Sequence, residues 1–122
     1  MPRVLVVSGD PHIRDEVEYG FPADVEVAVA DDARVAWSYM REEIPDAAIV
    51  DIHTGSAGGY GLAKDMSQDP RLSKVPVLML LERAQDTWLA RQAGAALIKA
   101  KPMSSTDLVR ETLAMMGATP KT

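Results

Sequence analysis

Short apolar runs typical of β-strands alternate with amphipathic stretches typical of helices along the whole chain. Side chains of a strand alternate between two faces, whereas apolar residues three and four positions apart share one face of a helix. On these patterns the strands are predicted at residues 3–7, 25–30, 47–51, 75–81 and 96–99. Helices are predicted in the intervals between the strands and after the last one.

Polar residues with short side chains precede three of the predicted helices. Asp10 stands before the first helix, and either Asp31 or Asp32 stands before the second. Such side chains accept hydrogen bonds from the unpaired N–H groups of a first helical turn. Ser104, with Asp107 three residues later, resembles a capping box for the last helix. These positions predict where the three helices begin.

Strict alternation of five strands with five helices predicts a parallel sheet with helices on both faces. The runs at 3–7, 47–51 and 75–81 are apolar on both faces except at Arg3 and Asp51 at their ends, so we expect these strands in the centre of the sheet. The mixed patterns at 25–30 and 96–99 are typical of edge strands. The predicted fold class is therefore α/β, a doubly wound five-stranded parallel sheet with five helices in the flavodoxin-like order 2-1-3-4-5.

The ligand crevice of such a sheet lies beyond the carboxyl ends of its strands, where the first and third strands are neighbours. Asp51 ends the third predicted strand, and residues 8–11 follow the first. The topology therefore predicts that Asp51 is the functional centre of the chain.

Composition narrows the class of protein. The chain has 122 residues, 47% of them hydrophobic and 25% charged, which is typical of one globular domain. We expect that domain to span residues 1–117, followed by a flexible tail at 118–122. The sequence has no cysteine, which excludes disulfides, thiolate zinc sites and thiol nucleophiles. The net charge of −5 argues against nucleic-acid binding.

No apolar run approaches the roughly 20 residues that a membrane-spanning helix needs. The N-terminus also lacks the long apolar segment of a signal peptide. We therefore expect a cytoplasmic protein without membrane insertion. No Ser/His/Asp or paired-carboxylate arrangement is readable in the sequence, so we expect no enzymatic activity.

Four motifs lie around the third and fifth predicted strands: Val50-Asp51-Ile52, Gly59-Tyr60 with Leu62, Gly94-Ala95 and Lys101-Pro102. They resemble the motifs of response-regulator receiver domains, the CheY-like family of two-component signalling. The resemblance covers the chain from Arg3 to about Met116, and it implies that Asp51 accepts a phosphoryl group from a histidine kinase. It also implies that Lys101 pairs with that group and that Mg²⁺ joins it to two acidic residues after the first strand.

Several positions depart from the receiver pattern. The two acidic residues are replaced by Ser8 and Gly9, and the hydroxyl residue that contacts the phosphoryl group at the end of the fourth strand is replaced by Leu81. The aromatic switch residue of the fifth strand is Ile98. Asp10 lies one position too late for the acidic pair, and the sequence leaves open whether it reaches the pocket.

The charges of these residues decide how the pocket is expected to behave. The receiver pattern implies three carboxylates and one lysine around a divalent cation, whereas Asp51 and Lys101 sum to zero, or to −1 with Asp10. We therefore expect Asp10 and Asp51 to bind Mg²⁺ only weakly, and no cofactor to be required. Leu81 cannot donate a hydrogen bond to a phosphoryl oxygen. Phosphorylation of Asp51 is accordingly expected to be possible but impaired, and the sequence leaves open that Asp51 forms only a structural salt bridge with Lys101.

The sequence thus predicts an atypical single-domain receiver that signals through protein–protein contacts, with a histidine kinase as a candidate partner. The expected output surface, which could also form a homodimer, consists of the fourth helix, the fifth strand and the fifth helix. Trp88 lies on that fourth helix, either exposed as an anchor or packed beneath Leu89. The alternative is a flavodoxin-like module that binds a small ligand or a metal. His12 and His53 are its candidate ligands, beside the acidic residues of the crevice.

Overall fold

The computed structural model describes residues 2–51, 58–101 and 103–117. The predicted flexible tail at 118–122 lies outside the described residues. Strands and helices alternate, and one short 3₁₀ helix precedes the fourth α-helix. The strands are β1 (Arg3–Val7), β2 (Glu26–Ala30), β3 (Ala47–Asp51), β4 (Val77–Leu81) and β5 (Leu97–Ala100). The helices are α1 (Pro11–Gly20), α2 (Ala33–Glu42), α3 (Gly59–Gln68), η1 (Ala84–Asp86), α4 (Thr87–Gln92) and α5 (Ser105–Gly117).

The five strands form one parallel sheet in the order β2-β1-β3-β4-β5, which confirms the predicted fold class. Every residue of β3 and β4 is buried, as expected for the centre of a sheet covered on both faces. The edge strands β2 and β5 are only partly buried. Burial therefore follows the apolar pattern that predicted the order.

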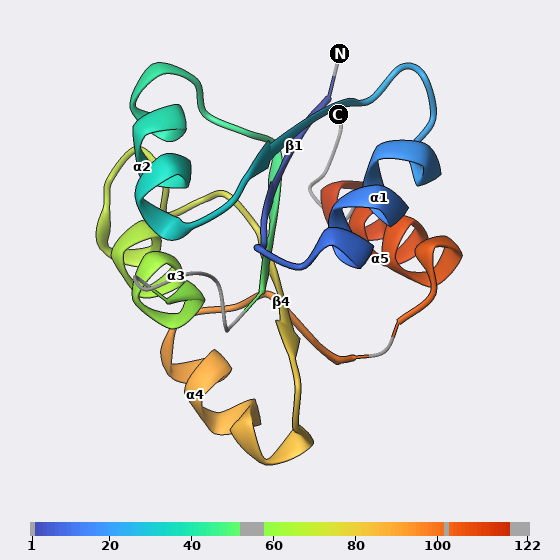
Figure 1. The fold of residues 1–122 in the computed structure, drawn as a ribbon. Helices are drawn as coiled ribbons and strands as arrows, with labels where there is room; N and C mark the ends of the chain where they lie inside the picture. The colour runs from blue at the N-terminus through green and yellow to red at the C-terminus, as the bar shows by residue number, and fades with distance from the viewer. Residues whose placement is uncertain (1, 52–57, 102, 118–122) are drawn as a thin grey trace.

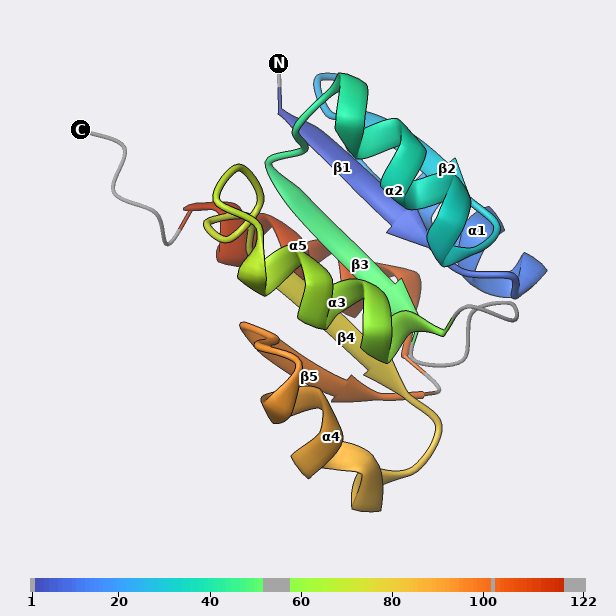
Figure 2. The ribbon, with the colours of Figure 1, turned by 90° about the vertical axis from the view of Figure 1, so that its left-hand side faces the viewer.

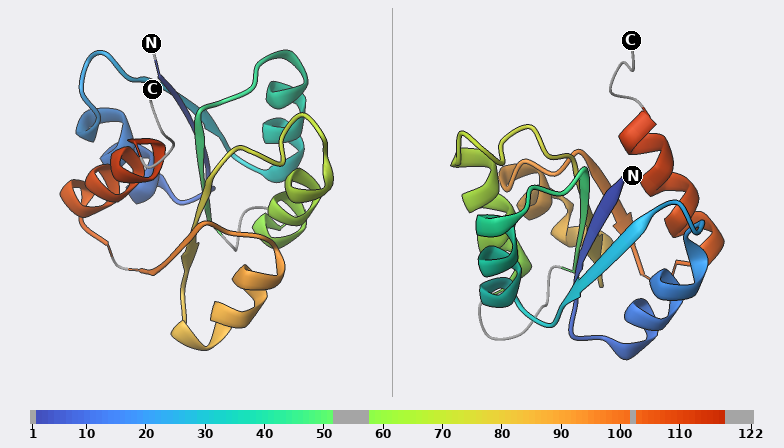
Figure 3. Two further views of the ribbon diagram at one scale, coloured as in Figure 1. Left: turned by 180° about the vertical axis from the view of Figure 1, so that it is seen from behind. Right: turned by 90° about the horizontal axis from the view of Figure 1, so that it is seen from above.

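Helices cover both faces of the sheet in two layers. In Figure 1, α1 and α5 lie on one side of the strands and α2, α3 and α4 on the other, and Figure 3 shows the same layers from behind and from above. Alternate residues of each central strand pack against one helix layer and then the other. In β1, Val4 and Val6 belong to the core beneath α1 and α5, whereas Leu5 and Val7 belong to the core beneath α2, α3 and α4.

The predicted helix caps are confirmed. The carboxylate of Asp10 accepts a hydrogen bond from the His12 N–H at 3.0 Å, and Asp32 accepts one from the Val35 N–H at 3.0 Å. Of the two candidates before α2, the cap is therefore Asp32. The Ser104 hydroxyl caps α5 by accepting a hydrogen bond from the backbone N–H of Asp107 at 3.1 Å.

Strand β4 is shorter than its apolar run predicted. It begins at Val77, because the N–H of Val75 is bonded to the carbonyl of Leu72 in a turn and Pro76 has no N–H to donate. The carbonyl of Pro76 still accepts the N–H of Ala48 from β3 at 3.0 Å. The start of the strand is therefore set by which backbone N–H groups can pair with the neighbouring strand, and side-chain hydropathy gives no information about this.

Both tryptophans are more exposed than core residues. Trp37 packs against the α2–α3 side of the core but is only partly buried. Trp88 is 62% exposed, which answers the question left open by the sequence in favour of the exposed alternative. Within the described residues, no helix has the length and apolar character needed to cross a membrane.

Candidate functional site

Asp51 lies at the carboxyl end of β3, in the middle of the sheet. Its side chain is almost completely buried, with 1% of the residue exposed. One carboxylate oxygen, Oδ2, accepts a hydrogen bond from Lys101 Nζ at 2.7 Å and another from the Ser8 hydroxyl at 3.0 Å. A buried carboxylate is tolerated only when donors or cations compensate for lost hydration, and these two groups supply that compensation.

Strand alternation explains why these residues meet. Asp51 has the same parity as Ala47 and Ile49, whose side chains face the α1–α5 layer. Ser8 follows β1 on the same face as Val4 and Val6, and Lys101 follows β5 on the same face as Leu97. Because the strands are parallel, their carboxyl ends gather at one edge of the sheet. Side chains from three separate strand ends therefore converge on one side.

Ser8 is completely buried and bonds in two directions. Its hydroxyl donates to Asp51 Oδ2 and accepts the backbone N–H of Asp10, each at 3.0 Å. A carboxylate at this position would repel Asp51 unless a cation lay between them. The serine hydroxyl instead bonds Asp51 directly, so this position stabilises the buried carboxylate without a metal.

Lys101 lies among three carboxylates. Its Nζ is 2.7 Å from Asp51, 3.8 Å from Asp10 and 3.9 Å from Glu82. The four ionised side chains together carry a net charge of −2, more negative than the sequence-based count, which omitted Glu82. The Glu82 side chain is 55% exposed, so its interaction with Lys101 is well screened by water. The signal for Glu82 was available, since it directly follows β4 and shares its parity with the inward-facing Leu80.

Asp10 reaches the edge of the pocket while it caps α1. One of its carboxylate oxygens accepts the His12 N–H, and the other is the oxygen that lies 3.8 Å from Lys101. The side chain is 36% exposed. The question that the sequence left open is therefore answered, because Asp10 is shared between the helix cap and the lysine.

The other two departures from the receiver pattern lie on the opposite side of the sheet. Leu81 is buried in the α2–α3–α4 core, and Ile98 is partly buried against the same core. Gly9 is exposed beside the pocket, and a Cβ built on it would approach nothing closer than the Asp31 carbonyl at 3.6 Å. His53, the other candidate metal ligand, lies outside the described residues. Within the described part of the chain, no group of three or more His, Cys, Asp or Glu side chains is arranged to hold a metal ion.

A cavity of about 300 Å³ opens beside Lys101, between α1 and α5. Its floor is apolar and includes Ile13, Leu80 and Leu108, while Asp10 and Lys101 lie at its polar side. Sequence reasoning missed this cavity because its lining comes from four separate segments. The Lys101 side chain is consequently not sealed on all sides, and 18% of it is exposed.

Comparison with known proteins identifies the relatives of this arrangement. A family model described as "Response regulator receiver domain" matches residues 4–112. The curated relatives include the response regulator Rre1 of Synechocystis, which is 29% identical over 94% of this chain and 53% of its own length. The chain thus spans about half the length of the curated relatives it matches.

Solved structures share the fold over nearly the whole chain. A putative response regulator from Chloroflexus aurantiacus is 28% identical, with a TM-score of 0.87 and coverage of 95% of this chain and 98% of that one. The chemotaxis protein CheY4 of Vibrio cholerae has the same TM-score at 24% identity, covering 94% of this chain and 98% of its own.

Proposed function

Because the chain belongs to the response regulator receiver domain family of two-component signalling, we propose that it is an atypical receiver whose phosphoacceptor, Asp51, is retained in a pocket poor in metal ligands. One observation carries the proposal. The neutral Ser8 hydroxyl bonds Asp51 at the position where the receiver pattern has a carboxylate. The pocket is therefore stabilised in its unmodified, metal-free form.

The cost of phosphorylation follows from the charges around Asp51. A phosphoryl group on a side chain carries about −1.5 to −2 charges near neutral pH. Lys101 can pair with it, but the carboxylates of Asp10 and Glu82 already lie within 4 Å of the lysine and compete for its charge. Mg²⁺, which prefers an octahedron of oxygen ligands, would find Asp51 and the edge-lying Asp10 as its acidic ligands. We therefore propose slow and incomplete phosphorylation at Asp51, with weak Mg²⁺ binding.

Intact-mass spectrometry after incubation with acetyl phosphate and Mg²⁺ tests this proposal. We expect an adduct of about 80 Da on only a small fraction of the protein, and none on the Asp51→Asn variant. A Ser8→Ala variant serves as the control for loss of the Ser8 hydrogen bond without added charge. Rapid and complete modification of the wild-type protein would refute the proposal that phosphorylation is impaired. An adduct that persists in Asp51→Asn would show that Asp51 is not the phosphoacceptor.

Restoring the two acidic residues is expected to restore metal binding. In the Ser8→Asp, Gly9→Asp double variant, two carboxylates join Asp51, and position 9 has space for a side chain. We expect the Mg²⁺-dependent adduct to increase at least about tenfold, because each added charge near 4 Å is worth kilocalories at intermediate dielectric. The Ser8→Asn, Gly9→Asn variant is the matched neutral control. Equal adduct yields in the two double variants would show that metal ligation does not limit the reaction.

The partners belong to the same proposal. We propose a histidine kinase as the phosphodonor and a protein as the target, contacted through α4, β5 and α5, with the exposed Trp88 as an anchor. The same surface could form a homodimer. No nucleic acid and no membrane take part in this proposed function, and the cytoplasmic location expected from the sequence completes it.

A further inference from the structure

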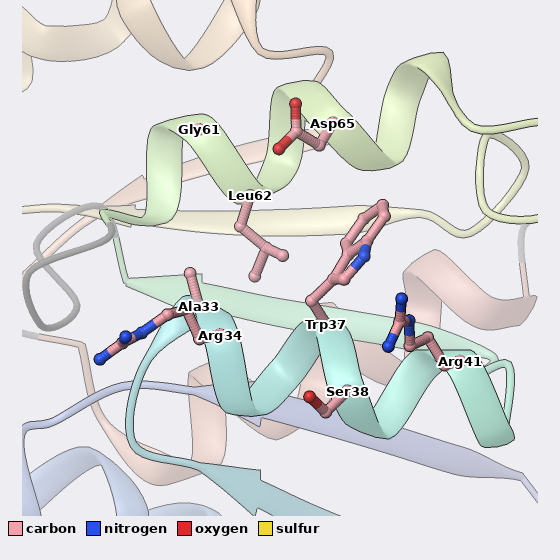
Figure 4. A pocket seen from close by; sticks show the side chains of 8 residues that line it. All are labelled: Ala33, Arg34, Trp37, Ser38, Arg41, Gly61, Leu62 and Asp65. Atoms are coloured by element: carbon pink, nitrogen blue, oxygen red, sulfur yellow. The ribbon is translucent and has the colours of Figure 1, made fainter.

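A groove of about 420 Å³ runs between α2 and α3, on the face of the sheet that is remote from α1 and α5. Figure 2 shows the two helices side by side in front of the strands, and Figure 4 shows the groove from close by. Its apolar part comes mainly from Trp37, since Ala33 and Leu62 line the groove but are themselves almost completely buried. The Trp37 indole stands between the two helices and is only partly buried, so part of its ring is accessible to whatever enters the groove.

Gly61 keeps part of the groove open. It lies in the first turns of α3 and lines the groove, and a Cβ built on it would have no atom within 4 Å. A side chain can therefore begin at this position without a clash at its first carbon atom. The groove can therefore be filled by a single substitution that leaves the surrounding packing in place.

Two arginines lie along the α2 side of the groove. Arg34 and Arg41 are both exposed, and neither forms an ion pair with another residue in the described part of the chain. They are seven residues apart on one helix, which places them on the same face about 10.5 Å from each other. On a protein with a net charge of −5, this pair is a local positive edge. Arginine and tryptophan are also the side chains most enriched among residues that dominate binding energy.

We propose that this groove binds an acidic amphipathic helix of a partner protein. A helix lying along α2 presents side chains at i and i+7 at the same spacing as Arg34 and Arg41, and its residues at i+3 and i+4 then face the apolar surface around Trp37. The occupant accordingly carries Asp or Glu at i and i+7 and leucine-like residues between them. The groove is an open channel rather than an enclosed chamber, as a helix requires.

Asp65 sets the orientation of the bound helix. It lies on α3 and lines the groove on the side opposite the α2 arginines. An acidic residue of the partner is repelled there and attracted on the opposite edge. The bound helix therefore directs its acidic side toward α2 and a neutral or basic side toward α3. This surface is separate from the Asp51 pocket, so the inference does not depend on phosphorylation.

The test uses a synthetic helical peptide with Glu at i and i+7 and Leu at i+3 and i+4. The protein carries Trp88→Phe, so that Trp37 is the one remaining tryptophan of the sequence and reports binding by its fluorescence. Anisotropy of a labelled peptide gives the dissociation constant. We expect saturable binding that weakens at least about tenfold in Gly61→Leu and in Arg34→Glu, Arg41→Glu. Asp65→Asn is expected to strengthen it by about twofold to threefold.

A peptide with Lys in place of both Glu residues is the control for charge, and Gly61→Ala is the control for the backbone. Circular dichroism and thermal melting establish that each variant is folded. If Gly61→Leu is not folded, the milder Arg34→Gln, Arg41→Gln variant tests whether peptide binding depends on the groove. Absence of binding, equal binding of the Lys peptide, or affinity unchanged by the arginine variants would overturn the proposal. Sedimentation showing self-association that Gly61→Leu abolishes would overturn it in favour of a second copy of this chain.

Discussion

Replacing Gly59 by alanine is expected to lower the free energy of unfolding by about 3 kcal/mol. Gly59 begins α3 where the helix passes over the end of β3. A Cβ there would clash with the carbonyl oxygen of Asp51 and would lie 2.8 Å from Cγ1 of Val50. Backbone atoms of a central strand cannot move aside without disturbing the sheet, so the helix itself must shift. Urea denaturation monitored by circular dichroism measures the loss.

Gly61→Ala is the matched control for that variant. It lies in the same helix two residues later, where an added methyl group meets no other atom. Alanine favours the helical conformation over glycine by about 0.5–1 kcal/mol, so this substitution is expected to stabilise the protein. Opposite signs at two neighbouring glycines would show that close packing on Asp51, and not helix propensity, accounts for Gly59. A Gly59→Ala variant as stable as the wild type would disprove the close approach.

Replacing Lys101 by methionine is expected to cost about 3 kcal/mol of unfolding free energy, the lower end of the range for breaking a buried ion pair. The methionine keeps much of the apolar length of lysine but leaves the Asp51 carboxylate without its ammonium partner at 2.7 Å. The value is at the lower end because 18% of the Lys101 side chain is exposed and water replaces part of the interaction. Chemical denaturation of the single variants and of Asp51→Asn, Lys101→Met completes a double-mutant cycle.

Lys99→Met provides the control for loss of a lysine from the same strand end. Lys99 is 3.4 Å from Glu111, but its side chain is 39% exposed, so the expected cost is below about 1 kcal/mol. The cycle is expected to give a coupling energy of about 1–3 kcal/mol between Asp51 and Lys101. Equal costs for the two lysine variants would mean that the pair makes no special contribution to the stability of the pocket.

The fold was predictable from the sequence because burial in a covered parallel sheet leaves an apolar signal at every position of a central strand. The strand order follows from that signal, and the helix caps at Asp10, Asp32 and Ser104 follow from short-range hydrogen bonding. The start of β4 at Val77 was not predictable from hydropathy, because it depends on where Val75 donates its N–H. At this position a hydrogen bond within a local turn replaces the hydrogen bond that would have paired Val75 with the neighbouring strand.

The site was predictable in its central pair and less so in its periphery. Asp51 and Lys101 come together because strand ends of equal parity must converge. The hydrogen bonds of Ser8 depend on its side-chain rotamer, and the position of Glu82 depends on the path of the chain after β4. The hydrophobic pattern of the sequence carries no information about either. The groove at Trp37 was missed for a related reason. An apolar helical stripe indicates that a tryptophan faces its neighbours, but not how much of its ring those neighbours leave accessible to solvent.

The Ser8 hydroxyl links the buried carboxylate to the surface of the molecule. It bonds Asp51 on one side and the backbone N–H of Asp10 on the other, and Asp10 in turn caps the first turn of α1. Any change in the charge of Asp51 alters the polarity of that hydroxyl, and through it the amide that begins the helix. Three consecutive hydrogen bonds thus connect a carboxylate that is only 1% exposed to the first turn of a helix at the surface of the protein.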